Sequence, residues 1–193
     1  MATICFDIDG VLADFHRDFL VFLKKELGSE YVACSAKAAK LNNHEGFTRA
    51  EFNKYNHKFI SVGGYARMSL TRQHYEKALF ALIRDGHEIC YITSRPPETR
   101  KDTIEWLANH GLPIGKIVFT ETKSDAAKLF KVSVVIEDRV ENIKSLTKNG
   151  FPCVLVSRPY NVGISLSGVP RVTTAKLLYK SIVKLLKERQ VTL

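Results

Sequence analysis

Apolar residues gather in five short runs along the chain, and helical patterns lie between most of these runs. The runs cover residues 4–6, 88–93, 116–119, 132–136 and 152–156. Runs this short and this apolar are typical of strands that are buried on both faces of a parallel sheet. Strands that alternate with helices through right-handed crossovers place helices on both faces. The pattern therefore predicts an α/β fold whose ligand site lies at the carboxyl ends of the strands.

Helices are predicted where apolar residues recur at helical spacing between capping residues and glycines. They are expected at 71–85, at 97–110, just after 123, at 140–148 and at 174–190. Thr71 is the expected N-cap of the first helix, and Gly86 is its expected end. The last helix is amphipathic, and we expect its apolar side to pack on the sheet rather than on a membrane or a partner.

The stretch from Leu12 to about Leu70 breaks this alternation, because it holds helical patterns and no clear strand. Within it, the segment Thr48-Arg-Ala-Glu51 is a capping-box signature that opens a helix through Phe59. We interpret residues 12–70 as a small helical cap inserted after the first strand. Residues 1–11 and 71–193 then form the core domain.

Two acidic residues follow the first strand in the segment ICFDIDGV. Strand alternation would point Asp7 and Asp9 the same way, into the loop beyond the strand. Like charges at such close range repel each other, so the pair indicates a bound cation or a shared proton. The simpler alternative is a turn, since Asp-Gly is a common turn dipeptide.

Polar residues also follow the other strands, in positions that suit a phosphate ligand. Thr93 and Ser94 offer hydroxyl and backbone N–H groups, and Lys123 offers a fixed positive charge. Glu137 and Asp138 supply acids at the end of the fourth run. Each group also has a simpler explanation. Thr93 and Ser94 could cap the next helix, Lys123 could be solvated, and Glu137 and Asp138 could begin a turn. Their occurrence after successive strands favours one shared site.

The composition of the 193 residues is that of one ordinary globular domain, with 45% apolar and 25% charged residues. The net charge of +9 suits anionic substrates or nucleic acid and does not choose between them. Neither a signal peptide nor a membrane span is indicated. Cys5, Cys90 and Cys153 lie in apolar runs and Cys34 stands alone, without metal-ligand or redox spacing. We therefore expect a cytoplasmic protein with reduced cysteines.

The four polar groups resemble, in order, the four motifs of the haloacid dehalogenase (HAD) superfamily. These motifs are an Asp-x-Asp pair, a Thr or Ser, a Lys and a terminal acidic pair, here Asp7-Ile-Asp9, Thr93, Lys123 and Glu137-Asp138. Further segments resemble the 5'(3')-deoxyribonucleotidase branch and its bacterial and phage relatives: Asp9-Gly-Val-Leu-Ala-Asp-Phe15, Thr93-Ser94-Arg95-Pro96, Ile136-Glu-Asp-Arg139 and Arg158-Pro-Tyr-Asn161. The resemblance implies a Rossmann-like core, with the cap between the first two motifs.

The chemistry expected of such a site is phosphate-ester hydrolysis through an aspartyl-phosphate. Asp7 would be the nucleophile, and Asp9 would protonate the leaving alkoxide and then activate water. A carboxylate attacking a phosphate needs a cation, and Mg²⁺ prefers oxygen ligands. Thr93, Ser94 and Lys123 would hold the transferring phosphoryl group.

The resemblance further implies metal ligation by the Asp7 carboxylate, the Asp9 backbone carbonyl and Asp138. Glu137 stands where many members of the superfamily carry Asp. Its implied role is to hold a water molecule bound to the metal rather than the metal itself. Phe15 would stack on the base of a nucleotide, or else simply pack beside Phe19 and Phe22 in a cap helix.

The leading hypothesis is a Mg²⁺-dependent phosphomonoesterase that acts on nucleoside monophosphates, with deoxyribonucleotides as the expected members of that class. One alternative is a 3'-phosphatase that acts on nucleic-acid ends and uses the basic surface as a strand track. Another is a non-catalytic nucleic-acid or protein-binding module on the same core. The expected partner is a small phosphate ester, with nucleic acid less favoured and no membrane. The sequence leaves open the base, the sugar, the 5' or 3' position and the oligomeric state.

Overall fold

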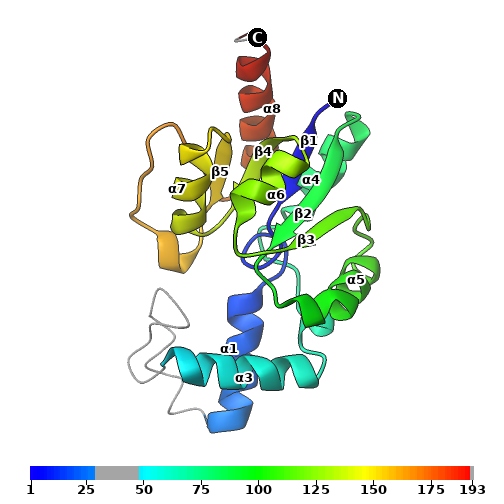
Figure 1. The fold of residues 1–193 in the computed structure, drawn as a ribbon, viewed down its shortest axis with the longest axis vertical. Helices are drawn as coiled ribbons and strands as arrows, with labels where there is room; N and C mark the ends of the chain where they lie inside the picture. The colour runs from blue at the N-terminus through cyan, green and yellow to red at the C-terminus, as the bar shows by residue number, and fades with distance from the viewer. Residues whose placement is uncertain (29–47, 192–193) are drawn as a thin grey trace.

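The computed structural model describes residues 1–28 and 48–191 of the chain. Its centre is a sheet of six parallel strands in the order β3-β2-β1-β4-β5-β6 (Figure 1). The strands are β1 (Thr3–Phe6), β2 (Glu88–Thr93), β3 (Lys116–Phe119), β4 (Val132–Glu137), β5 (Cys153–Val156) and β6 (Arg171–Val172). Five of them match the predicted runs, and the α/β fold is confirmed. The two-residue β6 was not predicted, because a segment that short carries no periodicity.

Helices cover both faces of the sheet, and successive strand residues feed two separate hydrophobic clusters. On β4, Val134 and Ile136 face one cluster, whereas Val135 faces the other. The first cluster includes residues of α4 (Glu76–Arg84), α5 (Arg100–Asn109) and α8 (Ala175–Val191). The second includes residues of α6 (Lys123–Leu129) and α7 (Val140–Lys148). Burial on both faces explains why the strands are continuous apolar runs.

The helix predicted at 71–85 begins later than expected. The helix α4 starts at Glu76, and Thr71 does not cap it. Instead, the Thr71 hydroxyl donates to the Val11 carbonyl at 3.0 Å, and its backbone N–H donates to Leu12 at 2.8 Å. Thr71 therefore ties the chain back to the loop after β1, a tertiary contact that local spacing cannot reveal. The stretch from Pro97 also differs slightly, since a 3₁₀ turn, Pro97–Thr99, precedes α5.

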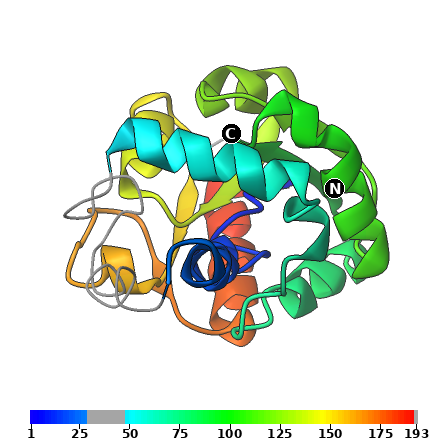
Figure 2. The same cartoon turned by 90° about the horizontal axis from the view of Figure 1, so that it is seen from below.

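Two helices of the inserted stretch lie beyond the carboxyl end of β1, at the end of the molecule opposite the C-terminus (Figure 1). They are α1 (Phe15–Leu27) and α3 (Arg49–Ser61), and from below α1 is seen end-on while α3 runs across the view beside it (Figure 2). The predicted capping box is present, because the Thr48 hydroxyl accepts from the Glu51 N–H and the Glu51 carboxylate accepts from the Thr48 N–H.

The chain leaves the core and returns to it through neighbouring segments. The Asp14 N–H donates to the Ser69 carbonyl at 2.9 Å, close to the Thr71–Leu12 bond. Phe19 and Phe59 of the two helices also belong to the same hydrophobic cluster as the sheet. The division into a cap at 12–70 and a core at 1–11 and 71–193 stays a prediction, and residues 29–47 of that cap lie outside the described residues.

The described cysteines are thiols in the core, as expected. Cys5, Cys90 and Cys153 are buried and unpaired, and Cys34 lies outside the described residues. Within residues 1–28 and 48–191, every helix is too short or too polar to cross a bilayer.

Candidate active site

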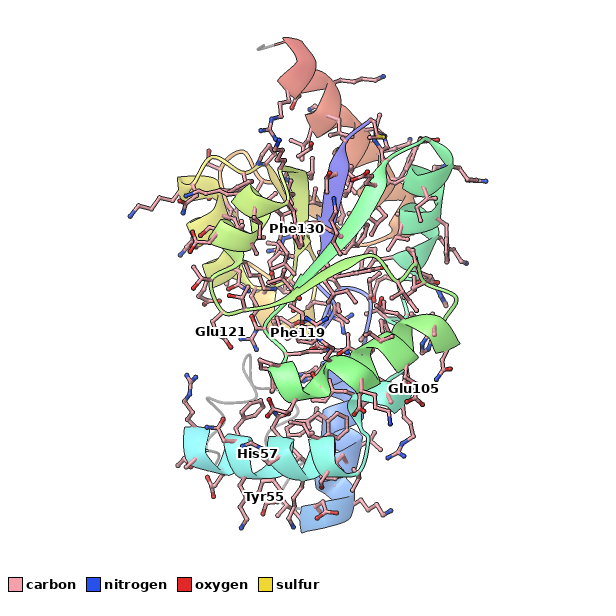
Figure 3. All side chains as sticks on the ribbon, turned by 45° about the vertical axis from the view of Figure 1, so that its right-hand side comes forward. Tyr55, His57, Glu105, Phe119, Glu121 and Phe130 are labelled. Carbon is pink, nitrogen blue, oxygen red and sulfur yellow. The ribbon has the colours of Figure 1, made fainter. Side chains whose placement is uncertain are left out.

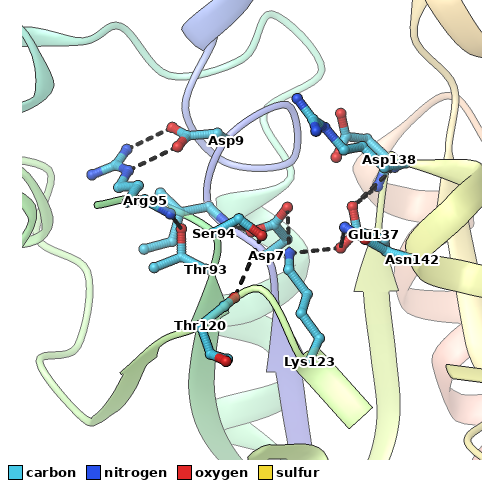
Figure 4. Close-up of polar contacts among 12 residues, drawn as sticks. Asp7, Asp9, Thr93, Ser94, Arg95, Thr120, Lys123, Glu137, Asp138 and Asn142 are labelled. Carbon is cyan, nitrogen blue, oxygen red and sulfur yellow. Dashed lines mark hydrogen bonds and ion pairs between the residues drawn. The ribbon is translucent and has the colours of Figure 1, made fainter. Parts of the chain in front are cut away.

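Asp7 and Asp9 do not point the same way, contrary to the expectation from strand alternation. In Figure 4, the Asp9 carboxylate faces Arg95, whereas Asp7 faces Lys123. The strand ends at Phe6, and the backbone then closes a tight loop in which Leu12 and Ala13 both donate to the Ile8 carbonyl at 2.8 Å. Alternation holds only for extended backbone, so this loop separates the two carboxylates.

Lys123 bridges two buried carboxylates at the centre of the site (Figure 4). Its Nζ lies 2.8 Å from Asp7 Oδ2 and 2.7 Å from Glu137 Oε2. The lysine is the first residue of α6, and its side chain is 4% exposed. The predicted fixed charge is therefore placed against the expected nucleophile, as a phosphoryl-transfer site requires.

Glu137 is saturated with hydrogen bonds from the protein. Its Oε1 accepts from the backbone N–H groups of Asp138 and Arg139 at 3.0 and 2.9 Å. Its Oε2 accepts from Lys123 and, at 3.2 Å, from the Asn142 amide. An ionised carboxylate offers about four acceptor positions, and four donors occupy them here. Glu137 thus anchors Lys123 and the β4–α7 loop.

Asp138 differs from its neighbour, because one of its oxygens is left without a partner. Its Oδ2 accepts from the Tyr160 hydroxyl, and the Asn161 amide donates to its backbone carbonyl at 2.7 Å. Its Oδ1 is buried and has no hydrogen-bond partner among the described residues. Gly10 packs directly against this carboxylate, where a Cβ atom would collide with it, so the loop after β1 needs a glycine here.

The acidic cluster offers oxygen ligands to a cation, with the acceptor positions of Glu137 already occupied by protein donors. One carboxylate oxygen from each of Asp7, Glu137 and Asp138 lies within 4.8 Å of the others, and all three residues are buried. Buried carboxylates with an orphaned oxygen are costly unless a positive charge compensates them. Because the set is all oxygen, a hard divalent cation suits it, and the unfilled oxygen is that of Asp138.

Crowding of these acids shifts their proton affinities apart. Burial and the Glu137 charge raise the pKa of Asp7 from 3.8 to about 7, although Lys123 opposes the shift. Burial also raises the pKa of Asp138 well above its usual range, with Glu137 and Asp7 adding to the effect. Burial opposes ionisation of Glu137 too, but Lys123 and the loop N–H donors outweigh it and hold that pKa at about 2. Asp7 and Asp138 therefore hold protons more readily than ordinary aspartates, whereas Glu137 stays ionised.

We expect the metal-free protein to lose stability as the pH rises from about 4 to 7. In this window folded Asp7 holds a proton that the unfolded chain has released, so the free energy of unfolding falls with increasing pH. Asp7→Asn should reduce this slope, since the amide does not titrate. Urea denaturation in the presence of a chelator, at pH 5 and pH 7.5, gives the free energy of unfolding of both proteins and hence its dependence on pH. Equal slopes in the two proteins would contradict the shift at Asp7.

The two hydroxyl residues lie at the end of β2 and line the same cavity as Asp7 and Asp9. The Thr93 hydroxyl is fully buried and accepts from the Arg95 backbone N–H at 3.2 Å. Ser94 lies beside it, and its hydroxyl is 3.5 Å from the Thr120 carbonyl. The cavity has a volume of about 460 Å³ and extends from these residues to Phe52 and Asn56 of α3. In Figure 3, Glu121, which also lines it, lies on the side of the core that faces α3.

Phe15 lies in the aromatic cluster of the two helices and also lines the cavity. Its ring stacks on Phe19 and on Tyr65, with centroids 5.1 and 5.7 Å away, and meets Phe59 edge-on. The half-buried side chain also lines the cavity. The expected packing beside Phe19 is therefore present, and stacking on a nucleotide base stays a prediction.

Several contacts of the site were missed by sequence reasoning. The pairing of Arg95 with Asp9, of Tyr160 with Asp138 and of Asn142 with Glu137 joins residues that are 86, 22 and 5 positions apart. Arg95 and Tyr160 stood inside motifs that the sequence singled out, so their location near the site was signalled. The residues with which they pair could not be predicted, because the pairing depends on how the ends of separate strands meet in the fold.

Comparison with known proteins identifies the family of this chain. Residues 1–186 match the model of the family described as "5' nucleotidase, deoxy (Pyrimidine), cytosolic type C protein". The chain is 25% identical over 177 residues to a protein of Bacillus cereus named "Putative nucleotidase", which covers 88% of this chain and 92% of that one. It is also 22% identical over 168 residues to a nucleotidase of Clostridium acetobutylicum, which covers 82% of each chain.

Solved structures share the fold. A HAD hydrolase of Entamoeba histolytica matches with a TM-score of 0.64 at 17% identity, over 97% of this chain and all of that one. A β-phosphoglucomutase of Clostridium difficile matches with a TM-score of 0.59 at 15% identity, over 99% of both chains. The chain therefore has the fold of the HAD hydrolases, and it belongs to the 5'-nucleotidase, deoxy (pyrimidine), cytosolic type C family, a family of nucleotidase-type hydrolases.

Proposed function

We propose that this protein is a Mg²⁺-dependent phosphatase of nucleoside monophosphates, deoxyribonucleotides in particular. The observation that carries the proposal is the arrangement of Asp7, Lys123 and Asp138 at the end of a cavity of about 460 Å³. That cavity also has an aromatic wall and the amide groups of α3, which suit a nucleoside. The family match supports the same class of substrate.

The first step transfers the phosphoryl group to Asp7. The Asp7 carboxylate attacks phosphorus, the bond from phosphorus to the ester oxygen breaks, and Asp9 gives its proton to the departing alkoxide. In the second step Asp9 takes a proton from water, the water oxygen attacks phosphorus, and the aspartyl bond breaks to release phosphate. Thr93, Ser94 and Lys123 hold the phosphoryl oxygens during both steps.

Asp7 and Asp138 are the residues that we propose to hold Mg²⁺ through their carboxylates, together with the backbone carbonyl of Asp9. The orphaned oxygen of Asp138 supports its part in the set. When bound, Mg²⁺ supplies positive charge that offsets the nucleophile and the phosphate. Glu137 is left out of the ligand set, because its acceptor positions are filled by the protein.

A substrate screen tests the proposal. Nucleoside monophosphates, sugar phosphates and 3'-phosphorylated oligonucleotides are assayed for phosphate release, with Mg²⁺ and with a chelator. We expect Mg²⁺-dependent release that is fastest from the nucleoside monophosphates. Preference for the oligonucleotides, with a steep loss of rate as salt is added, would instead identify a phosphatase of nucleic-acid ends.

Phe15→Ala should lower kcat/KM for nucleoside monophosphates by about ten- to hundred-fold, because a stacked base contributes roughly 1–3 kcal/mol. Hydrolysis of a small phosphate ester without a base should barely change. Phe22→Ala is the matched control, since Phe22 lies on the same helix and contacts Phe19 and Phe59 but does not line the cavity. It should lower stability while the ratio between the two substrates stays constant. Equal losses on both substrates in Phe15→Ala would remove Phe15 from the base site.

A cytoplasmic location is part of the proposal, and the buried free thiols in the core support it. So is the division of the chain into a core and a cap over the site at 12–70. The described cap helices α1 and α3 supply the cavity residues Phe15, Phe52 and Asn56, which supports a role in holding the nucleoside.

A further inference from the structure

Asp9 is held by an arginine that is itself wholly enclosed. Arg95 Nε donates to Asp9 Oδ2 at 2.9 Å and Nη2 donates to Oδ1 at 2.8 Å, so the fork is bidentate (Figure 4). The Arg95 side chain is 0% exposed, whereas the Asp9 side chain is 23% exposed. Bidentate pairing fixes the plane of a carboxylate as well as its distance. Arg95 thus contacts Asp9 from the protein side, and the carboxylate keeps an open side toward the cavity.

The arginine is fixed in turn by three further contacts. Its Nη1 donates to the Thr103 hydroxyl of α5 at 3.0 Å. The ring of Tyr65 lies 4.9 Å from its guanidinium, and the ring of Trp106 lies 5.5 Å from it. A planar guanidinium suits such aromatic surroundings, which a lysine ammonium would use less well. Arg95 therefore has little freedom to move, and neither does the carboxylate that it holds.

The same contacts connect Asp9 to the helices over the cavity. The Tyr65 hydroxyl donates to the Asn56 side chain of α3 at 3.0 Å, and the Trp106 indole donates to the Met68 carbonyl at 2.7 Å. Tyr65 and Met68 belong to the segment by which the chain returns from α3 to the core. The orientation of Asp9 is thus set jointly by the end of β2, by α5 and by this segment.

We infer that Arg95 is a positioning residue for the proposed acid and base, and that it acts through Asp9 rather than on the phosphate. The inference rests on the proposed function. The two carboxyl oxygens of Asp9 offer about four positions, of which Arg95 uses two. The part of Asp9 that is exposed lines the cavity, so a remaining position there can carry the proton that Asp9 gives to the leaving alkoxide. Proton transfer to the leaving oxygen and from water uses that open side. Without Arg95 the Asp9 carboxylate can rotate away from the line between leaving oxygen and proton, and misplaced groups transfer protons poorly.

Substrates with different leaving groups distinguish a positioning role of Arg95 from a purely structural role. The alkoxide of a nucleoside must be protonated as it departs, whereas p-nitrophenolate leaves without a proton. Since kcat/KM reports the steps up to departure of the leaving group, Arg95→Gln should lower kcat/KM for a deoxyribonucleoside 5'-monophosphate by about ten- to hundred-fold. The value for p-nitrophenyl phosphate should stay within about threefold. Arg95→Lys should give a smaller change of the same kind, because it keeps the charge and loses the fork.

The decisive test is a double-mutant cycle with Asp9→Asn. If Arg95 acts through Asp9, Arg95→Gln added to Asp9→Asn should leave the ratio of the two kcat/KM values unchanged. A further drop in that ratio, or a large rise in KM for both substrates, would place Arg95 on the phosphate and overturn the inference. Equal losses for both substrates in the single variant would reduce Arg95 to a structural role and overturn it as well.

Two controls keep the result interpretable. Circular dichroism and thermal denaturation check that each variant folds, and if Arg95→Gln does not, Arg95→Lys carries the test with an expected ratio change of several-fold. A ratio that does not change in a folded Arg95→Lys would then contradict the inference. The wild type is assayed first on both substrates, because a wild type that hydrolyses neither of them refutes the proposed function itself.

Discussion

Asp7→Asn is expected to abolish turnover of every phosphate ester while the fold stays intact. The amide keeps the shape of the side chain, but it is a poor nucleophile and cannot form the aspartyl-phosphate. Removing a nucleophile costs more than removing an acid or base group, which is worth roughly 10²–10⁴ in rate. A variant that keeps more than about a hundredth of the wild-type rate would exclude Asp7 as the nucleophile.

The structure adds a stability readout to that experiment. Asp7 lies beside Glu137 and Asp138, and Lys123 contacts the carboxylates of Asp7 and Glu137. Neutralising Asp7 relieves repulsion, so the metal-free variant should melt at the same temperature as the wild type or higher near pH 8. An inactive variant that also melts well below the wild type would show that the fold, and not the nucleophile, had been lost. Beryllium fluoride mimics the aspartyl-phosphate, so together with Mg²⁺ it should inhibit the wild type. It should not bind to the variant.

Asp9→Asn is the second large effect that we expect, a loss of about 10²–10⁴ in kcat/KM for nucleoside monophosphates. The asparagine can neither protonate the alkoxide nor take a proton from water. With p-nitrophenyl phosphate the first step should survive, so rapid mixing should show a burst of one nitrophenolate per enzyme before slow turnover. Absence of a burst, together with equal losses on both substrates, would argue against the acid and base role.

Metal binding separates Asp9 from Asp138. We propose that Asp9 holds Mg²⁺ only through its backbone carbonyl, which the asparagine variant keeps. The Mg²⁺-induced rise in melting temperature should therefore persist in Asp9→Asn and vanish in Asp138→Ala. If Asp9→Asn loses that rise as completely as Asp138→Ala, the division of roles between the two residues is wrong.

The fold was largely determined by local pattern. Five apolar runs set between helical patterns predicted the five longer strands, and the capping box at Thr48 predicted the start of α3. The predicted N-cap at Thr71 was wrong. Thr71 is a good capping residue, but its hydroxyl donates instead to the carbonyl of Val11, which is far away in the sequence. Propensity and capping describe what a segment can do, and tertiary contacts select among the options.

For the site, the sequence by itself determined which residues gather: Asp7, Asp9, Thr93, Ser94, Lys123 and Asp138 follow parallel strands, whose carboxyl ends share one edge of the sheet. Only the tertiary structure decided how they are paired. It turned Asp9 toward Arg95 and away from Asp7, and it filled every acceptor position of Glu137 while leaving an oxygen of Asp138 without a partner. Side-chain pairing depends on the distances and directions between separate strand ends, and linear spacing does not encode these quantities.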